Sequence, residues 1–169
     1  MFPWLGQLMY WSCITDLNLP CTFNTWAQIT FLHMWLLTAR FRLFPAEFAP
    51  SWHQHLLDHF SFDAERRMIE YHALAASGVR QRYLKDLFIQ WRGSLAAYDE
   101  GVVKGDAVLA GAVWRNIFGG RELRDGDVES IAAVVGYIRH WLRALDKIDD
   151  GEVAGGWVEF DQVKVAKQA

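Results

Sequence analysis

The segment from Thr22 to Ala39 constrains the fold more than any other part of this chain. It is strongly apolar on every side of a helix, and the run is interrupted by Asn24, Gln28, Thr30 and His33. A membrane-spanning helix needs about 20 predominantly apolar residues, and these interruptions disfavour one. A helix that is apolar all round is instead buried among neighbours on several sides. The segment therefore predicts a buried central helix that is capped by Thr22 or Asn24 and ends near Phe41.

Two later segments show apolar residues spaced three and four apart, which is the period of one helix face. The first stripe runs from Leu84 through Phe88 to Tyr98, and the second runs from Val128 to Leu145. With the central helix and the segments between them, they predict an all-α fold: a single-domain helical bundle of five to seven helices.

Turn and cap residues suggest where these elements begin and end. Asp106 is expected to cap a helix that stops at the two glycines after Phe118, and Asp125 or Asp127 to cap the last long helix. We divide the chain into an N-terminal helical segment at 1–19, the main domain at 20–150 and a C-terminal tail at 151–169. The tail is rich in glycine and alternates weakly, so we expect it to be loose or to form one short strand.

Composition narrows the class of protein. The 169 residues are 52% apolar and 22% charged, which is typical of a folded domain, and the net charge of -3 provides no general field for DNA. Nine tryptophans are unusually many. They belong either to a Trp-rich core or to a surface that meets a partner or a lipid. Cys13 and Cys21 fit neither a disulfide framework nor a zinc pattern, and we interpret both as free thiols.

Few residues suggest catalytic chemistry. His55, His59 and Asp63 lie four apart and would share one helix face, so a metal-dependent helical enzyme is one alternative. No Glu-x-x-His repeat accompanies them, and a polar helix face explains them more simply. His33 is interpreted as a hydrogen-bonded core residue, and Ser94 has no base that the sequence identifies. We therefore predict no catalytic residue, no metal and no cofactor.

One stretch of the chain concentrates basic residues. A peripheral docking site for the ribosome or for acidic lipid would use these five side chains: Arg66, Arg67, Arg80, Arg82 and Lys85. Acidic residues such as Glu65 and Glu70 are interleaved with them. A solvated face held by salt bridges is the simpler interpretation.

The segment from Ala97 to Phe118 is the most informative for binding, because charged residues crowd around a two-glycine turn. A purely structural corner would explain it, with glycines for backbone freedom and carboxylates as caps. A charged recognition surface is compatible with such a corner. The candidate partner-binding residues are Trp91, Arg92, Asp99, Glu100, Lys104, Asp106, Trp114 and Arg115.

At this segment the chain resembles the ubiquinol–cytochrome c chaperone family. The resemblance also covers the strings TFNTWAQITFLHMWLLTARFR, HQHLLDHFSFDAERRM and RYLKDLFIQWRGSLAAYDEG, and it extends over Pro20 to Asp150. These strings are long and composite, so chance agreement is improbable, and they look closest to the fungal mitochondrial branch.

The resemblance implies an all-helical binding protein rather than an enzyme. It implies a chaperone for assembly of ubiquinol–cytochrome c reductase (complex III). Such a protein receives newly made cytochrome b beside the mitochondrial ribosome and works with a small helical partner. It implies a place on the matrix side of the inner membrane, with peripheral association. The first Lys or Arg of this chain is Arg40, so no Arg-rich transit peptide is visible in it.

Overall fold

The computed structural model describes residues 17–163 and residue 165. The described part contains six α-helices and no strand: α2 (Phe23–Phe41), α3 (Ala49–Glu70), α4 (Ser77–Lys104), α5 (Asp106–Asn116), α6 (Asp127–Leu145) and α7 (Asp150–Ala154). The all-α prediction is confirmed. Of the N-terminal segment predicted to be helical, residues 1–16 lie outside the described residues. Residues 17–22 hold a turn and no helix, and Leu17 and Leu19 are buried.

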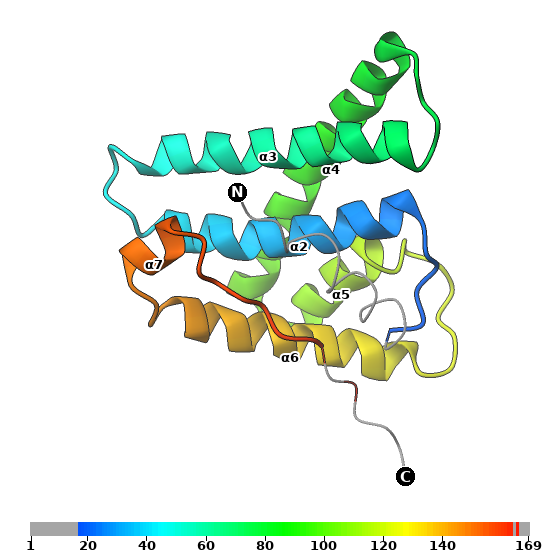
Figure 1. Ribbon diagram of the computed structural model, residues 1–169. Coiled ribbons are helices and arrows are strands. Elements are labelled where there is room, and N and C mark those ends of the chain that lie inside the picture. The colour runs from blue at the N-terminus through cyan, green and yellow to red at the C-terminus, as the bar shows by residue number, and fades with distance from the viewer. Residues whose placement is uncertain (1–16, 164, 166–169) are drawn as a thin grey trace.

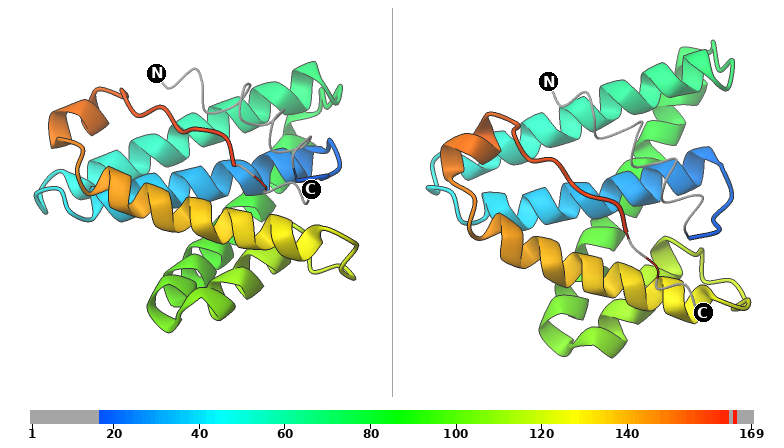
Figure 2. Two further views of the ribbon diagram at one scale, coloured as in Figure 1. Left: turned by 90° about the horizontal axis from the view of Figure 1, so that it is seen from below. Right: turned by 60° about the horizontal axis from the view of Figure 1, so that its bottom comes forward.

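The helices form two layers, with an extended segment on one outer face (Figure 1). Helices α3, α2 and α6 lie side by side with α2 in the middle, and α4 and α5 pack on one face of this layer. The opposite face carries the extended residues 155–163, as the turned views show (Figure 2). Helix α2 therefore has neighbours on every side, which is the arrangement that its all-round apolar sequence predicts.

Helix α2 begins as the sequence predicts. Thr22 is the N-cap, and its hydroxyl accepts a hydrogen bond of 3.1 Å from the backbone N–H of Thr25. The helix ends near Arg40, whose guanidinium is buried against the C-terminal end of α6. There it donates to the carbonyl oxygens of Leu145 at 2.9 Å and Ile148 at 2.8 Å. These bonds tie the end of α2 to the end of α6 and to the residues that follow it.

Two predicted caps are wrong. The N-cap of α5 is Gly105, with a φ of 107° that favours glycine, and Asp106 is the first helical residue. The N-cap of α6 is Gly126 in the left-handed region, and neither Asp125 nor Asp127 caps the helix. In both places glycine provides the backbone geometry, and the aspartate at the next position is free to pair with an arginine.

The C-terminal segment is more ordered than the loose tail that its composition suggests. After the short helix α7, Val158, Phe160 and Val163 are buried against the helical layer. The Phe160 ring lies 4.6 Å from the Trp141 ring and 4.9 Å from the His33 ring, measured between centroids. Residues 155–163 therefore cover the part of α2 and α6 that no helix covers.

Candidate interaction surfaces

The predicted recognition segment lies where α4 turns back into α5. Gly101 packs against α5 so closely that a Cβ atom there would lie 2.7 Å from the Cα of Leu109. Val102 and Asp106 are held from the other side by Arg139 of α6, which bonds the Asp106 carboxylate at 2.8 Å. The corner is therefore closely packed between α4 and α5 and joined to α6 through Arg139.

Asp99 has a structural role in this corner. Its carboxylate accepts from the Trp35 indole at 2.9 Å and from both terminal nitrogens of Arg42 at 2.8 Å. Burial alone would raise the pKa of the Asp99 carboxyl, but the hydrogen bonds from Arg42 and Trp35 outweigh it and lower that pKa. The bonds join α4 to α2, so Asp99 is engaged within the fold.

Trp91 is also structural, because it is buried in the core beside Phe31. Because Trp91 lies on the buried face of α4, it cannot serve as the surface contact that the sequence suggested. Trp114 is half-buried, and its indole donates to the Arg121 carbonyl at 2.8 Å. The exposed members of the predicted partner-binding set are Arg92, Glu100, Lys104, Asp106 and Arg115.

Glu100 and Lys104 form an exposed pair one helical turn apart. The Lys104 ammonium lies 2.5 Å from the Glu100 carboxylate, and this hydrogen bond lowers the pKa of the Glu100 carboxyl, with a further contribution from Arg115. An exposed i,i+4 pair adds little to stability because water solvates both charges. The pair remains available to a partner.

The basic concentration divides into paired and unpaired side chains. Arg66 and Arg67 both bond Asp63, at 2.6 and 2.9 Å, and Arg80 bonds Glu65 at 2.9 Å. Arg67 also lies over the Trp26 ring, at 4.6 Å from its centroid. In contrast, Arg82 and Lys85 are exposed, and neither forms a salt bridge within residues 17–163.

The apolar spacing does not predict that two adjacent large residues of α4 are exposed. Phe88 was assigned to the buried stripe, yet its side chain and that of Ile89 are both exposed. Five large apolar residues lie between Leu84 and Trp91, and one face of a helix cannot bury all of them. Counting them against the width of the buried face would have revealed the excess.

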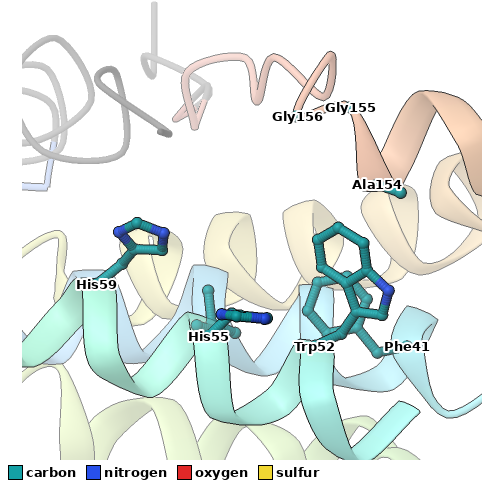
Figure 3. Close-up of a pocket in the computed structure, with 8 residues that line it drawn as sticks. Phe41, Trp52, His55, His59, Ala154, Gly155 and Gly156 are labelled. Atoms are coloured by element: carbon teal, nitrogen blue, oxygen red, sulfur yellow. The ribbon is translucent and has the colours of Figure 1, made fainter. Parts of the chain in front are cut away.

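His55 and His59 border a hollow of about 280 Å³ between α3 and the start of the extended segment. Figure 3 shows both rings projecting from α3, with Trp52 drawn in front of Phe41 and with Gly155 and Gly156 on the far side. Asp63 does not join the two imidazoles, because Arg66 and Arg67 hold its carboxylate. Over the described ranges, no three His, Cys, Asp or Glu residues are grouped so that they could hold a metal ion.

His33 is buried between α2 and α6. Its Nδ1 lies 2.8 Å from the Ile29 carbonyl, so this nitrogen carries the proton, and Nε2 accepts from the Tyr137 hydroxyl at 2.9 Å. Burial lowers the pKa of His33 to about 4, so the ring is neutral near pH 7. Its two partners satisfy it as a core residue, as the sequence analysis expects.

The seven tryptophans that the structure describes are mainly internal. Trp26, Trp35, Trp91 and Trp141 are buried, and Trp157 alone of the seven is exposed. The Trp-rich core is therefore the better of the two interpretations for these residues. Among the described helices, none combines the length and apolar character needed to cross a membrane.

Comparison with known proteins identifies the family. The family model described as "Ubiquinol-cytochrome C chaperone" matches residues 15–160. This chain belongs to the ubiquinol–cytochrome c chaperone family. A yeast relative, mitochondrial protein CBP3 of Saccharomyces cerevisiae, is 42% identical to the chain over 154 residues. The alignment covers 90% of the chain and 45% of the yeast protein.

Animal relatives are more distant. Ubiquinol–cytochrome c reductase complex assembly factor 1 of Drosophila melanogaster is 31% identical over 166 residues, covering 94% of the chain and 62% of that protein. The human assembly factor of the same name is 28% identical over 155 residues, covering 83% of the chain and 48% of that protein. The chain thus spans about half the length of these chaperone-family relatives.

A solved structure supports the fold. The crystal structure of the Cbp3 homolog from Brucella abortus superposes with a TM-score of 0.68 and covers 94% of this chain and 90% of that one. The two sequences are 20% identical, so the likeness establishes the shared chaperone-family fold and says nothing further of function.

Proposed function

We propose that this chain is a chaperone for the assembly of ubiquinol–cytochrome c reductase, acting by binding and not by catalysis. The observation that carries the proposal is the family match over residues 15–160, together with the assembly role in the names of the animal relatives. The fold is compatible with such a role, since the helical bundle presents charged side chains from α4 and α5 on its surface.

The proposal extends to the partners of this chain and to its location in the mitochondrion. We propose that the client is newly made cytochrome b, that a small helical protein assists, and that the work takes place beside the mitochondrial ribosome on the matrix side of the inner membrane. The mitochondrial name of the yeast relative supports the compartment. Within the α4–α5 corner, the residues proposed to contact a partner are the exposed Arg92, Glu100, Lys104, Asp106 and Arg115.

Complementation in yeast tests the function directly. The chain, fused to a mitochondrial targeting sequence, is expressed in Saccharomyces cerevisiae lacking CBP3. We expect restored respiratory growth and restored levels of assembled reductase. A variant with Asp in place of the buried Leu109 serves as the unfolded control. If the chain accumulates in mitochondria at normal levels and growth is not restored, the proposed function is wrong.

A second candidate function is peripheral docking to the ribosome or to acidic lipid. The observation that favours it is the pair of exposed cations at Arg82 and Lys85, which form no ion pair within the described ranges. Arg66, Arg67 and Arg80 contribute little net charge, because nearby carboxylates neutralise them. Sedimentation with ribosomes or anionic vesicles should then weaken as salt rises.

The metal-enzyme alternative has its own test. Elemental analysis of the purified chain is compared with that of a variant carrying both His55→Gln and His59→Gln. We expect no change in metal content and no loss of reductase assembly. Stoichiometric metal that disappears in the double variant would establish a metal site at these two histidines.

A further inference from the structure

The outward face of α4 carries an uncovered stripe opposite its buried side. Its members are spaced one, three or four apart and are all exposed: Arg82, Lys85, Ile89, Arg92, Gly93 and Ala96. The other side of the helix is buried through Leu87, Trp91 and Tyr98. Helices α4 and α5 lie on the side of the molecule away from residues 155–163 (Figure 2). We call these six residues the α4 stripe.

The α4 stripe has an excess of positive charge. None of Arg82, Lys85 and Arg92 forms a salt bridge with any residue of the described ranges. From position 82 to position 96 the chain contains one acidic residue, Asp86. Elsewhere on α3 and α4 the arginines meet carboxylates at 2.6–2.9 Å. The three cations of the stripe therefore match a ligand that presents carboxylates.

The shape of the α4 stripe suits a helix. Ile89 projects between Lys85 and Arg92 and is 60% exposed. Gly93 and Ala96 follow with almost no side chain, and a Cβ atom at Gly93 would meet nothing within 4 Å. Small residues allow two helix axes to approach to the short end of the usual range of about 8–10 Å. The Ile89 side chain, followed by the small residues Gly93 and Ala96, therefore leaves space in which the side chains of a second helix can pack.

We propose that the α4 stripe binds one amphipathic helix of a protein partner, whose apolar ridge packs on Ile89, Gly93 and Ala96. The carboxylates that border this ridge would pair with Arg82, Lys85 and Arg92. From Arg82 to Ala96 the stripe is about 21 Å long, so the bound helix is roughly 14 residues long. The inference rests on the proposed function for its mitochondrial setting and adds to it the surface and the chemistry of the partner.

Two other ligands fit the α4 stripe less well. A lipid surface requires a contiguous apolar area that can insert, and here cations flank one isoleucine. Single-stranded RNA is held by aromatic rings on which successive bases stack. The exposed aromatic residues of this region, Tyr83 and Phe88, leave α4 about 140° apart, so they cannot form one stacking platform.

Photo-crosslinking identifies what touches the α4 stripe. Benzoylphenylalanine is placed at Ile89 of the full chain in yeast mitochondria, and at Val128 of α6 as a matched control, since both positions are 60% exposed. We expect at least tenfold more product at Ile89. The crosslinked peptide should come from an amphipathic helical segment with Asp or Glu beside its apolar ridge. A lipid or RNA product, or no excess over Val128, would overturn the proposal.

Charge reversal tests the electrostatic part. Lys85→Glu with Arg92→Glu should lower the crosslink yield at Ile89 at least tenfold while the melting temperature stays the same. The matched control is Arg143→Glu with Lys147→Glu, two exposed cations elsewhere on the surface. Replacing two Asp or Glu residues of the crosslinked segment with Lys should restore the crosslink yield of the variant with charge reversals at Lys85 and Arg92. If this replacement does not restore it, the proposed pairing is wrong.

The crosslink and the complementation distinguish two kinds of failure. Respiratory growth of yeast that carries the unmodified chain tests the assembly function. The crosslinked product at Ile89 tests contact with the partner helix and is measured whether or not growth is restored. Purified chain is also mixed with vesicles containing anionic lipid and with single-stranded RNA. Binding to either probe that is abolished by the double reversal at Lys85 and Arg92 would assign the stripe to that ligand and overturn the protein-helix proposal.

Discussion

At the scale of single residues, three polar side chains in or beside the core have specific hydrogen-bond partners, whereas others, such as the Tyr98 hydroxyl and the Trp26 indole, have none within the part of the chain that the structure describes. His33 bonds the Ile29 carbonyl of its own helix and the Tyr137 hydroxyl of α6. Asp99 and Arg40 each form two or more hydrogen bonds to other elements. Burial of an unpartnered polar group is costly, so such residues are retained where a distant element supplies the partner. The sequence places His33 on an apolar helix, but only the fold brings Tyr137 to it.

His33 should make stability depend on pH. Its pKa is about 4 in the folded protein and 6.5 when unperturbed, so the unfolded chain binds more protons between these values. Its contribution is complete above the unfolded pKa and is lost as the pH falls toward the folded one. From about pH 7.5 to about pH 5, we expect a loss on the order of 2 kcal/mol of unfolding free energy from this group.

Urea titrations of His33→Gln at both pH values test this. The variant should show a flatter pH profile than the wild type, and His140→Gln, at an exposed position on α6, is the control substitution. Parallel profiles for wild type and His33→Gln would contradict the assignment.

Gly101 should be intolerant of even one methyl group. A Cβ atom would lie 2.7 Å from the Leu109 backbone, which cannot move without shifting α5. We expect Gly101→Ala to lower the unfolding free energy by about 1–3 kcal/mol. Gly136→Ala is the matched control, because a Cβ there meets nothing within 4 Å and alanine favours helix by about 1 kcal/mol. Thermal melts in which both variants change stability alike would show that the α4–α5 contact is loose.

At the scale of elements, residues 155–163 act as part of the core. Phe160 packs on Trp141 and His33, so Phe160→Ala should cost about 3–5 kcal/mol of unfolding free energy. Trp157→Ala, three residues earlier and 79% exposed, should change it by about 0.5 kcal/mol or less. Denaturant unfolding compares the two. Equal, small effects of the two substitutions would show that residues 155–163 form the loose tail that their composition suggests.

The α4–α5 corner should separate binding from folding. Lys104 is exposed and pairs with the exposed Glu100, so Lys104→Glu should leave the melting temperature within about 2 °C of wild type. If the corner contacts a partner, co-purification of nascent cytochrome b should fall, because rim charges act mainly on association. Arg124→Glu, an exposed change in the α5–α6 connection, is the control. Normal co-purification would remove Lys104 from the proposed surface.

At the scale of the whole molecule, the exposed apolar residues favour association. Large side chains such as Phe62, Ile69 and Ile89 are exposed on α3 and α4. Exposed apolar area of this kind marks interaction surfaces. We expect the isolated chain to self-associate as its concentration rises, and Ile89→Asp to reduce this. Sedimentation velocity over a hundredfold range of concentration measures it. A single monomeric species throughout would count against an uncovered partner surface.

Much of the architecture follows from the sequence alone. The apolar run from Thr22 to Ala39 predicts a buried central helix, the three-four spacings predict the long helices, and the quoted strings predict the family. These features are local: the helical period decides which residues share a face, and a face that is apolar must be covered. Both the helical period and the apolar character of a face can be obtained from a single sequence, because neither depends on distant contacts.

The tertiary structure decided what covers each face and which charges remain available. The cover over α2 formed by residues 155–163 and the engagement of Asp99 and Trp91 all depend on residues 50 or more positions away. The periodicity of one helix specifies its faces but not its neighbours. Whether Arg80 is neutralised, by Glu65 of α3, and Arg82 is left unpaired is therefore decided by packing, because an ion pair between two helices requires both side chains at the same place in space.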